Sequence, residues 1–166
     1  MRHALSLAVS IFALAACSGT QDTTQLRGAL DASRISLSDS VSITEASMTA
    51  GRATAAHLQP GTAATFRVLA IGGGAGALVH VDLEGAIRSS TPASTTDACP
   101  DSISLAQAIA IAEAHAHGTA VAIEPDDDGP CNREVQVLRA DDVLWEVKVG
   151  PTGTVVESEL SDETED

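Results

Sequence analysis

Cys99 and Cys131 are the two residues of this chain best placed for a covalent reaction with each other. A helix that starts just after Cys99 and a strand that returns along it would each span about 22–23 Å, so the loop that holds Cys131 comes back to the start of the helix. In an exported protein such a pair predicts a disulfide. The alternative is a reactive or metal-binding thiol pair, which neither a CxxC spacing nor a cluster of histidines supports.

Cys17, the third cysteine, follows a segment with the features of a secretion signal. Arg2 gives a basic start, residues 4–14 form an apolar run too short to span a bilayer, and small residues precede the cysteine. The sequence Leu14-Ala15-Ala16-Cys17 resembles the lipobox of bacterial lipoproteins, which implies cleavage after residue 16 and a lipidated Cys17 at the mature N-terminus. An ordinary secretion signal with a chance cysteine is the alternative.

The polar segment of residues 17–34 shows no sustained hydrophobic period. It predicts a flexible tether that reaches about 20–25 Å from the lipid. By resemblance to lipoproteins of double-membraned bacteria, Ser18 after the cysteine implies sorting to the outer membrane, facing the periplasm. The predicted location is therefore the cell envelope.

Acidic residues far outnumber basic ones, with 23 aspartates and glutamates against nine lysines and arginines. Loss of the signal peptide, residues 1–16, removes Arg2 and leaves a formal charge of 8 − 23 = −15. Most of the excess lies in residues 99–166, where sixteen acids and three bases give −13. This charge argues against a nucleic-acid partner. It suits a basic protein partner, or it serves only to keep an anchored domain solvated.

Asp126, Asp127 and Asp128 form a dense acidic group just before Cys131 and are the candidate partner-binding residues. They are similar to the start of a calcium-binding loop, but Pro130 occupies the third ligand position and no glutamate follows at the required distance. The disulfide would hold this acidic edge beside the start of a helix, which tolerates carboxylates. The alternative is a solvated loop with no binding role.

The remaining polar motifs predict neither an active site nor a metal site. His115 and His117 are two residues apart on a predicted helix, so their side chains diverge, and His57 and His80 alternate outward on strands of the first half. The chain contains no GxSxG, HExxH or P-loop motif. The sequence therefore predicts a protein that is not an enzyme, with no cofactor and no bound metal.

The elements that position these residues come in two copies. Residues 35–46 read ISLSDSVSITEA and residues 103–114 read ISLAQAIAIAEA, with six of the twelve positions identical. Helical spacing of apolar residues is followed in each copy by period-two alternation. The predicted fold class is α+β, as two tandem small units that each pack one helix on a three- to four-stranded antiparallel sheet. The units are expected at 35–90 and 99–160, before an acidic tail at 161–166.

The second helix is expected from about residue 103 to 117, closed by Gly118 in left-handed geometry. Its core face consists of Leu105, Ala108, Ile109, Ala112 and Ala116. The matching face of the first helix consists of Leu37, Ser40, Val41, Thr44 and Met48. The first face is more polar, so the first copy should have the poorer core. Among the strands, Trp145 alternates with the inward set that includes Val147.

The second copy resembles the PepSY domain, a module of metallopeptidase propeptides and bacterial envelope proteins. The similarity lies in ISL, an alanine-rich helix that ends in glycine, and then the strand patterns VxI, VxVL, WxVxV and GTVV. It is good over residues 99–160 and weaker over 35–90, where residues 72–76 (GGGAG) replace a short charged hairpin. The resemblance implies a peptidase-binding, peptidase-inhibiting or sensing role and carries no catalytic residues.

The leading functional expectation is a lipid-anchored envelope module that inhibits or senses a peptidase. Its partners would be the membrane, through Cys17, and an envelope peptidase or another basic protein. The alternative is a structural or divalent-cation-buffering envelope lipoprotein without a peptidase partner.

Overall fold

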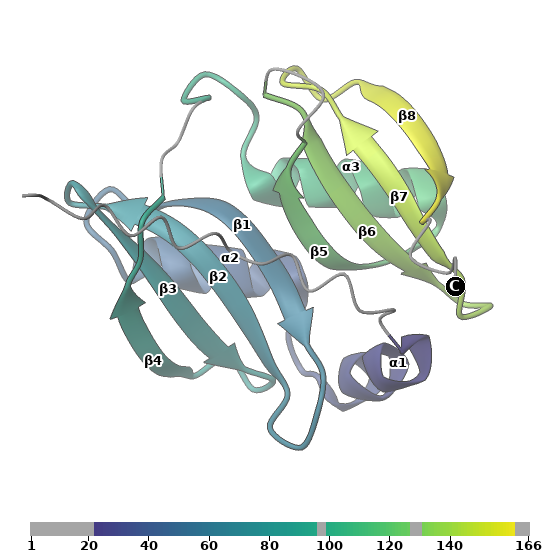
Figure 1. Cartoon of the computed structure of the whole chain (residues 1–166), viewed down its shortest axis with the longest axis horizontal. Coiled ribbons are helices and arrows are strands. Elements are labelled where there is room, and N and C mark those ends of the chain that lie inside the picture. Colours follow the sequence, from purple (N-terminus) through teal and green to yellow (C-terminus); the bar gives the residue numbers. More distant parts are fainter. Residues whose placement is uncertain (1–21, 96–98, 127–130, 162–166) are drawn as a thin grey trace, which may run out of the picture.

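The structure is a computed structural model that describes residues 22–95, 99–126 and 131–161 (Figure 1). Its helices are α1 (Thr23–Ala32), α2 (Leu37–Ala46) and α3 (Leu105–Ala116). The strands after α2 are β1 (Arg52–Gln59), β2 (Thr65–Gly72), β3 (Ala75–Asp82) and β4 (Ile87–Pro92). The strands after α3 are β5 (Gly118–Pro125), β6 (Arg133–Arg139), β7 (Leu144–Val149) and β8 (Val155–Leu160). No helix in these ranges is long and apolar enough to cross a membrane.

The strands of both halves join into one antiparallel sheet of eight strands, in the order β4-β3-β2-β1-β5-β6-β7-β8. The prediction of two tandem units with separate sheets is therefore wrong. The halves meet at β1 and β5, where Ala56 pairs with Ile123 and His57 pairs with Ala122. In separate units, β1 and β5 would each be an exposed edge with unpaired backbone N–H and C=O groups. Their pairing removes both edges.

Helices α2 and α3 contact each other and cover the same face of the sheet, behind the strands in Figure 1. Helix α2 packs mainly on β1 and β2, and α3 packs on β5, β6 and β7. One cluster of buried apolar side chains from both halves fills the space between helices and sheet. The two copies thus share a single core, which differs from the two small cores expected.

The predicted inward faces of the helices are confirmed except at Met48, which lies beyond the end of α2 and is only partly buried. The buried residues of α3 are Leu105, Ala108, Ile109, Ala112 and Ala116. Those of α2 are Leu37, Ser40, Val41 and Thr44. The polar character of the first face is real, because Ser40 is fully buried and its Oγ donates a hydrogen bond to the Leu37 carbonyl at 2.7 Å.

A glutamate shared by the two repeats links each helix to the strand that follows it. Glu45 Oε1 accepts a hydrogen bond from Ala53 N at 2.8 Å, and Glu113 Oε1 accepts one from Ala120 N at 2.9 Å. Both amides lie where the register with the next strand shifts. Such an irregularity leaves an amide without a strand partner. The repeated glutamate supplies the missing acceptor in both copies.

Helix α1 replaces most of the predicted flexible tether, so that prediction does not hold for residues 22–34. Asp22 caps the helix by accepting a hydrogen bond from Thr24 N. Leu26 and Ala29 are buried, three residues apart, which is the spacing of one helical face. Leu26, Ala29 and Leu30 are the apolar residues at helical spacing in this helix. Three residues are too few for a hydrophobic period to stand out in a polar segment.

Helix α1 is held by contacts to both halves of the sheet. The Arg27 Nε lies 2.9 Å from Asp142 Oδ1, in the turn between β6 and β7. Just after the helix, Arg34 N donates to the Leu83 carbonyl at 2.8 Å, in the turn between β3 and β4. The segment therefore bridges the first and second copies.

Two local predictions in the second copy need correction. His117, and not Gly118, takes the left-handed conformation after α3, with φ of 56°. Gly118 starts β5, where an added Cβ would lie 2.6 Å from the Leu138 carbonyl oxygen, so close approach to β6 requires the glycine. Trp145 packs against the core but is only partly buried. It is paired with Leu160 of the edge strand, which leaves its ring partly uncovered.

Candidate functional site

The sheet face turned away from α2 and α3 carries a cross-strand row of residues that is polar on every strand except β5, where it has Ala122. Directly paired residues on neighbouring strands point to the same face. From β4 to β8 the row consists of Ser89, His80, Arg67, His57, Ala122, Gln136, Glu146 and Glu159. We call it the polar row. The next residue along most strands belongs to the core, as Val68 does after Arg67, and points toward the helices.

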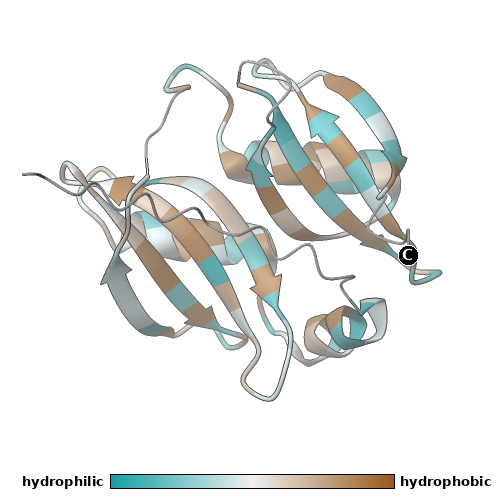
Figure 2. Ribbon diagram, viewed as in Figure 1, coloured by the Kyte–Doolittle hydropathy of each residue, from teal (hydrophilic) through white to brown (hydrophobic). Residues whose placement is uncertain are grey.

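The polar row changes its chemistry at the β1–β5 junction. On the first half it consists of a guanidinium between two imidazoles, and on the second half it ends in carboxylates. A second cross-strand row adds Glu124, Glu134, Lys148 and Glu157 on the same face of the second half. Figure 2 shows the strands banded in alternating hydrophilic and hydrophobic colours, as expected of a sheet with one covered face.

Carboxylates are crowded on the second half. Burial, followed by the neighbouring Glu146 and Glu124 carboxylates, raises the pKa of Glu134 from 4.5 to about 7. Burial also raises the pKa of Glu146. Lys148 offsets part of the negative charge, and its Nζ lies 3.0 Å from Glu157 Oε2. The crowded carboxylates around Glu134 therefore favour a bound proton, or a cationic group of a partner, at this position.

The first half carries His57, Arg67 and His80 side by side. Burial is the main cause that lowers the pKa of His57 to about 4, and Arg67 and His80 lower it further. The pKa of His80 is lowered by burial and by Arg67. Burial and the neighbouring guanidinium therefore disfavour the charged form of both imidazoles. The two histidines share the outward face, as expected, but the arginine between them was not anticipated.

An open pocket of about 440 Å³ lies beside His80, at the end of the face formed by the β1–β2 turn. Its lining residues are Gln59, Pro60, Gly61, Thr62, Ala63, Thr65, His80, Arg88 and Ser89. The guanidinium of Arg88 forms an ion pair with Asp82. The pocket thus extends the basic end of the polar row.

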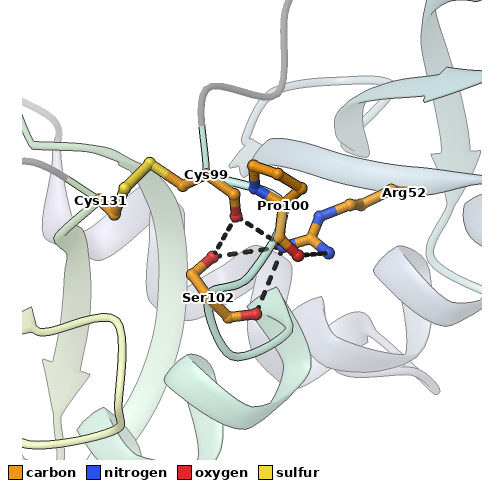
Figure 3. The surroundings of a disulfide bond; sticks show 5 residues. All are labelled: Arg52, Cys99, Pro100, Ser102 and Cys131. Atoms are coloured by element: carbon orange, nitrogen blue, oxygen red, sulfur yellow. Dashed lines mark hydrogen bonds between the residues drawn. A yellow bond between two sulfur atoms is a disulfide. The ribbon is translucent and has the colours of Figure 1, made fainter.

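The predicted disulfide is present between Cys99 and Cys131, with Cα atoms 5.4 Å apart. It lies next to a contact between the two halves, drawn in Figure 3. Arg52, at the start of β1, donates from Nη2 to the Cys99 carbonyl at 3.0 Å and from Nη1 to the Pro100 carbonyl at 2.8 Å. It also reaches the Ser102 carbonyl and hydroxyl. The disulfide therefore fixes the segment to which the first half binds.

The other predicted site residues fall partly outside the described residues. Cys17, Asp127 and Asp128 lie there. Asp126 is described, and its Oδ2 accepts a hydrogen bond from Asn132 Nδ2 at 3.4 Å. His115 and His117 lie at the end of α3, apart from the polar row. Within the described ranges, no group of three or more His, Cys, Asp and Glu side chains is arranged to hold a metal ion.

The polar row is the feature that sequence analysis missed. The sequence does contain a signal for the polar row. Along β6 and β7, buried valines alternate with the polar residues Glu134, Gln136, Glu146 and Lys148. Alternation assigns each side chain to a face but not to a neighbour. Which residues stand side by side depends on strand order and register, and β1–β5 pairing decides both for the whole row.

Comparisons with known proteins give little further information. No protein-family profile matches the chain, that of the PepSY domain included, and no curated protein matches it. A crystal structure of a "putative lipoprotein" from Clostridium difficile 630 is similar at 14% identity, covering 77% of this chain and 94% of that chain, with a TM-score of 0.46. At this distance the function has to be argued from this chain alone.

Proposed function

We propose that this protein is a lipid-anchored, non-catalytic binding protein of the bacterial cell envelope. The disulfide between Cys99 and Cys131 carries the first part, because stable disulfides belong to proteins that fold in an oxidising compartment outside the cytoplasm. The apolar residues 4–14 and the sequence Leu14-Ala15-Ala16-Cys17 supply an export signal and an acylation site that agree with it.

The helix-free sheet face is the proposed binding surface. Its second half presents Glu124, Glu134, Glu146, Glu157 and Glu159 with one lysine among them. The raised pKa of Glu134 supports this choice, because crowded carboxylates gain most from a nearby cation. We propose that a basic segment of an envelope protein binds there.

An envelope peptidase is the proposed partner class. This finer step is supported only by the resemblance of residues 99–160 to PepSY domains and by the charge of the acidic half. Under this proposal the anchored protein restrains a peptidase, or senses it, without cleaving anything itself.

The anchor is tested by the Cys17→Ala variant expressed from the full-length chain. We expect the wild-type protein to incorporate labelled fatty acid and to stay with membranes in high salt, because several acyl chains on one cysteine anchor stably. The variant should lose both properties. A Cys99→Ser/Cys131→Ser double variant is the matched control and should remain labelled. Membrane retention and labelling of the Cys17→Ala variant would contradict the proposal.

Binding is tested with purified residues 18–166 immobilised and exposed to the solubilised envelope proteins of the source organism. A Glu134→Gln/Glu146→Gln variant should capture less of a basic partner, while Glu84→Gln, an exposed acid in the β3–β4 turn, should capture as much as wild type. Addition of the soluble protein in excess should slow the captured peptidase on a peptide substrate. Equal capture by all three proteins, or no peptidase among the captured proteins, would overturn the partner assignment.

A further inference from the structure

Strand β8 forms one end of the sheet, and within the described part of the chain no strand lies beyond it (Figure 1). Helix α3 packs mainly on β5, β6 and β7. Two large apolar side chains of β8 are more than half exposed, Val156 at 56% and Leu160 at 55%. An exposed edge strand offers backbone groups with which an extended segment of another chain can pair.

The backbone groups of two residues of β8 point to this open edge. Ser161 N donates to the Leu144 carbonyl at 3.1 Å, so Ser161 bonds to the neighbouring chain. Bonding alternates along an antiparallel strand, so Ser158 and Leu160 turn their N–H and C=O groups away from β7. The register with β7 is regular over residues 157–160 and shifts just before them. This short stretch is therefore the part of the edge that can accept another strand.

Carboxylates line the same stretch on the helix-free face. Glu157 and Glu159 are paired across the sheet with Lys148 and Glu146 of β7. Lys148 Nζ lies 3.0 Å from Glu157 Oε2, so this carboxylate has a cation beside it. Glu159 faces another carboxylate, and like charges directly opposite each other destabilise a sheet. A cation on the open side of Glu159 would offset this repulsion.

The alternation along β8 defines the side chains that an added antiparallel strand should carry. Residues opposite Glu157 and Glu159 would occupy non-hydrogen-bonded positions, where facing side chains approach most closely, so cations fit there. Residues opposite Ser158 and Leu160 would lie on the helix side, near the exposed Leu160 and the partly buried Trp145, so apolar side chains fit there. The complementary segment is extended and alternates basic with apolar residues.

Two other pairings fit the charges less well. Strand β4, at the opposite end of the sheet, carries Arg88 and no carboxylate, and it ends in Pro92, which lacks an N–H donor. Pairing of β8 with β8 of a second copy would place glutamates opposite glutamates. Charge complementarity therefore favours β8 as the edge and a basic strand of another protein as its occupant.

From these observations we propose that the open edge of β8, residues 157–160, binds an extended segment of a partner protein in which Lys or Arg alternates with apolar residues. The segment would be added to the sheet as a further strand. This inference rests on the proposed function and supplies its binding mode, because the basic side chains would lie on the same helix-free face as the acidic half of the sheet.

The test uses the mature protein with its anchor in detergent micelles and its disulfide intact. The probe is a capped peptide of sequence Lys-Val-Lys-Val-Lys-Val, and nuclear magnetic resonance follows amide shifts and hydrogen exchange. We expect saturating peptide to slow exchange at the Ser158 and Leu160 amides at least about tenfold, because both become hydrogen-bonded. The Glu159 amide, which already bonds to β7, is the internal reference and should change little.

Two control peptides separate strand addition from simple attraction between charges. A peptide of the same sequence with N-methylated valines keeps its charge but cannot donate hydrogen bonds to the edge. It should bind at least about tenfold more weakly. A peptide with Glu in place of each Lys should not bind, because its carboxylates would face Glu157 and Glu159.

A charge reversal on the protein tests the position of the segment. Glu159→Lys should weaken binding of the Lys-Val peptide at least about fivefold, since attraction becomes repulsion. The matched control is Glu84→Lys, an equal change at an exposed acid in the β3–β4 turn, which should alter the affinity less than about twofold. An amide spectrum of each variant verifies that it is folded.

Equal affinity of the N-methylated peptide would overturn strand addition, as would unchanged exchange at Ser158 and Leu160 in the saturated complex. If Glu134→Gln/Glu146→Gln still weakens such binding, the basic partner proposed above survives, so the two failures are distinguishable. Protection of the Ser158 and Leu160 amides that appears without peptide as the protein concentration rises would assign the edge to a second copy and would also overturn the proposal.

Discussion

Glu45 and Glu113 explain why a charged residue recurs inside an otherwise apolar repeat. Both occupy the eleventh position of the repeated stretch, and both accept a hydrogen bond from a strand amide. In the sequence this glutamate indicates a repeat and no role of its own. Its role is visible only after the helix end and the irregular strand are placed together, because the bond joins residues seven or eight positions apart in different elements.

We expect Glu113→Ala to lower the free energy of unfolding by about 1–3 kcal/mol, because it leaves the partly buried Ala120 amide without an acceptor. Glu113→Gln should cost less, since its side-chain oxygen can still accept the bond. Asp101→Ala, an exposed acid before α3, is the control and should change stability by less than about 0.5 kcal/mol. Chemical denaturation measures all three. An alanine variant as stable as wild type would show that water replaces the carboxylate.

Glu134 makes the stability of the protein depend on pH in a definite direction. Its pKa is about 7 in the folded protein and near 4.5 when exposed, so the folded state binds more protons between these values. The contribution of Glu134 to the free energy of unfolding therefore falls as pH rises from 4.5 to 7. His57, with a pKa lowered to about 4, acts in the opposite direction between pH 4 and 6.5.

Glu134→Gln isolates the first effect. We expect the variant to be more stable than wild type at pH 8, where the wild-type carboxylate is charged beside Glu146 and Glu124, and close to wild type at pH 5. Melting midpoints at the two pH values measure the difference. A stability difference independent of pH would mean that the glutamate titrates normally, which would also weaken the case for an acidic binding surface.

Helix α1 shows what hydrophobic periodicity recovers and what it overlooks. The period was sufficient for α3 and for the inner strands, which present several apolar residues on one face, and for α2, where Leu37 and Val41 share a face with two buried hydroxyl residues. Helix α1 presents two buried residues in a segment with several polar ones. It is held by the burial of Leu26 and Ala29 and by hydrogen bonds of the Arg27 side chain and the Arg34 backbone amide, whose partners cannot be identified from the sequence.

Leu26→Ala tests whether α1 belongs to the fold. Leu26 is fully buried, so we expect a loss of about 2–5 kcal/mol in the free energy of unfolding. Gln25→Ala, on the exposed side of the same helix, should have little effect. If the two variants are equally stable, α1 is not packed on the sheet and the segment returns to being a tether.

At the scale of the whole molecule, one feature was beyond the reach of sequence analysis. The alternation along β1 and β5 predicts that each has a buried face, and both are buried as predicted. It does not say that these two strands pair with each other, because each pattern would be the same in a separate unit with a free edge. Two residue pairs between β1 and β5 turn two predicted sheets into one.

The same limit applies to the candidate site. The cysteine pair was predictable, because element lengths bring residues 99 and 131 together within one copy. The polar row was not, because its members come from both copies and their order depends on the β1–β5 junction. The outward histidines of the first copy and the strand acids of the second therefore share one sheet face, with Ala122 between them.

The disulfide and Arg52 should act together in holding the two halves. Closing a loop of 32 residues contributes about 3–4 kcal/mol in the chain-entropy model. The bond also fixes the carbonyls of Cys99 and Pro100, to which Arg52 donates from the first half. Part of the contribution of Arg52 should therefore disappear when the bond is absent.

A double-mutant cycle measures this dependence. The Cys99→Ser/Cys131→Ser variant should lose about 3–4 kcal/mol, and Arg52→Gln should lose about 1.5–3 kcal/mol in the oxidised protein. In the serine background, Arg52→Gln should cost less than half as much, because its acceptors are no longer held in place. The matched control is Arg27→Gln, whose partner Asp142 lies beyond the end of β6 opposite to Cys131, and its cost should be the same in both backgrounds. Additive losses for Arg52 would mean that residues 99–102 keep their conformation without the disulfide, so that the two halves are joined by β1–β5 pairing and the shared core alone.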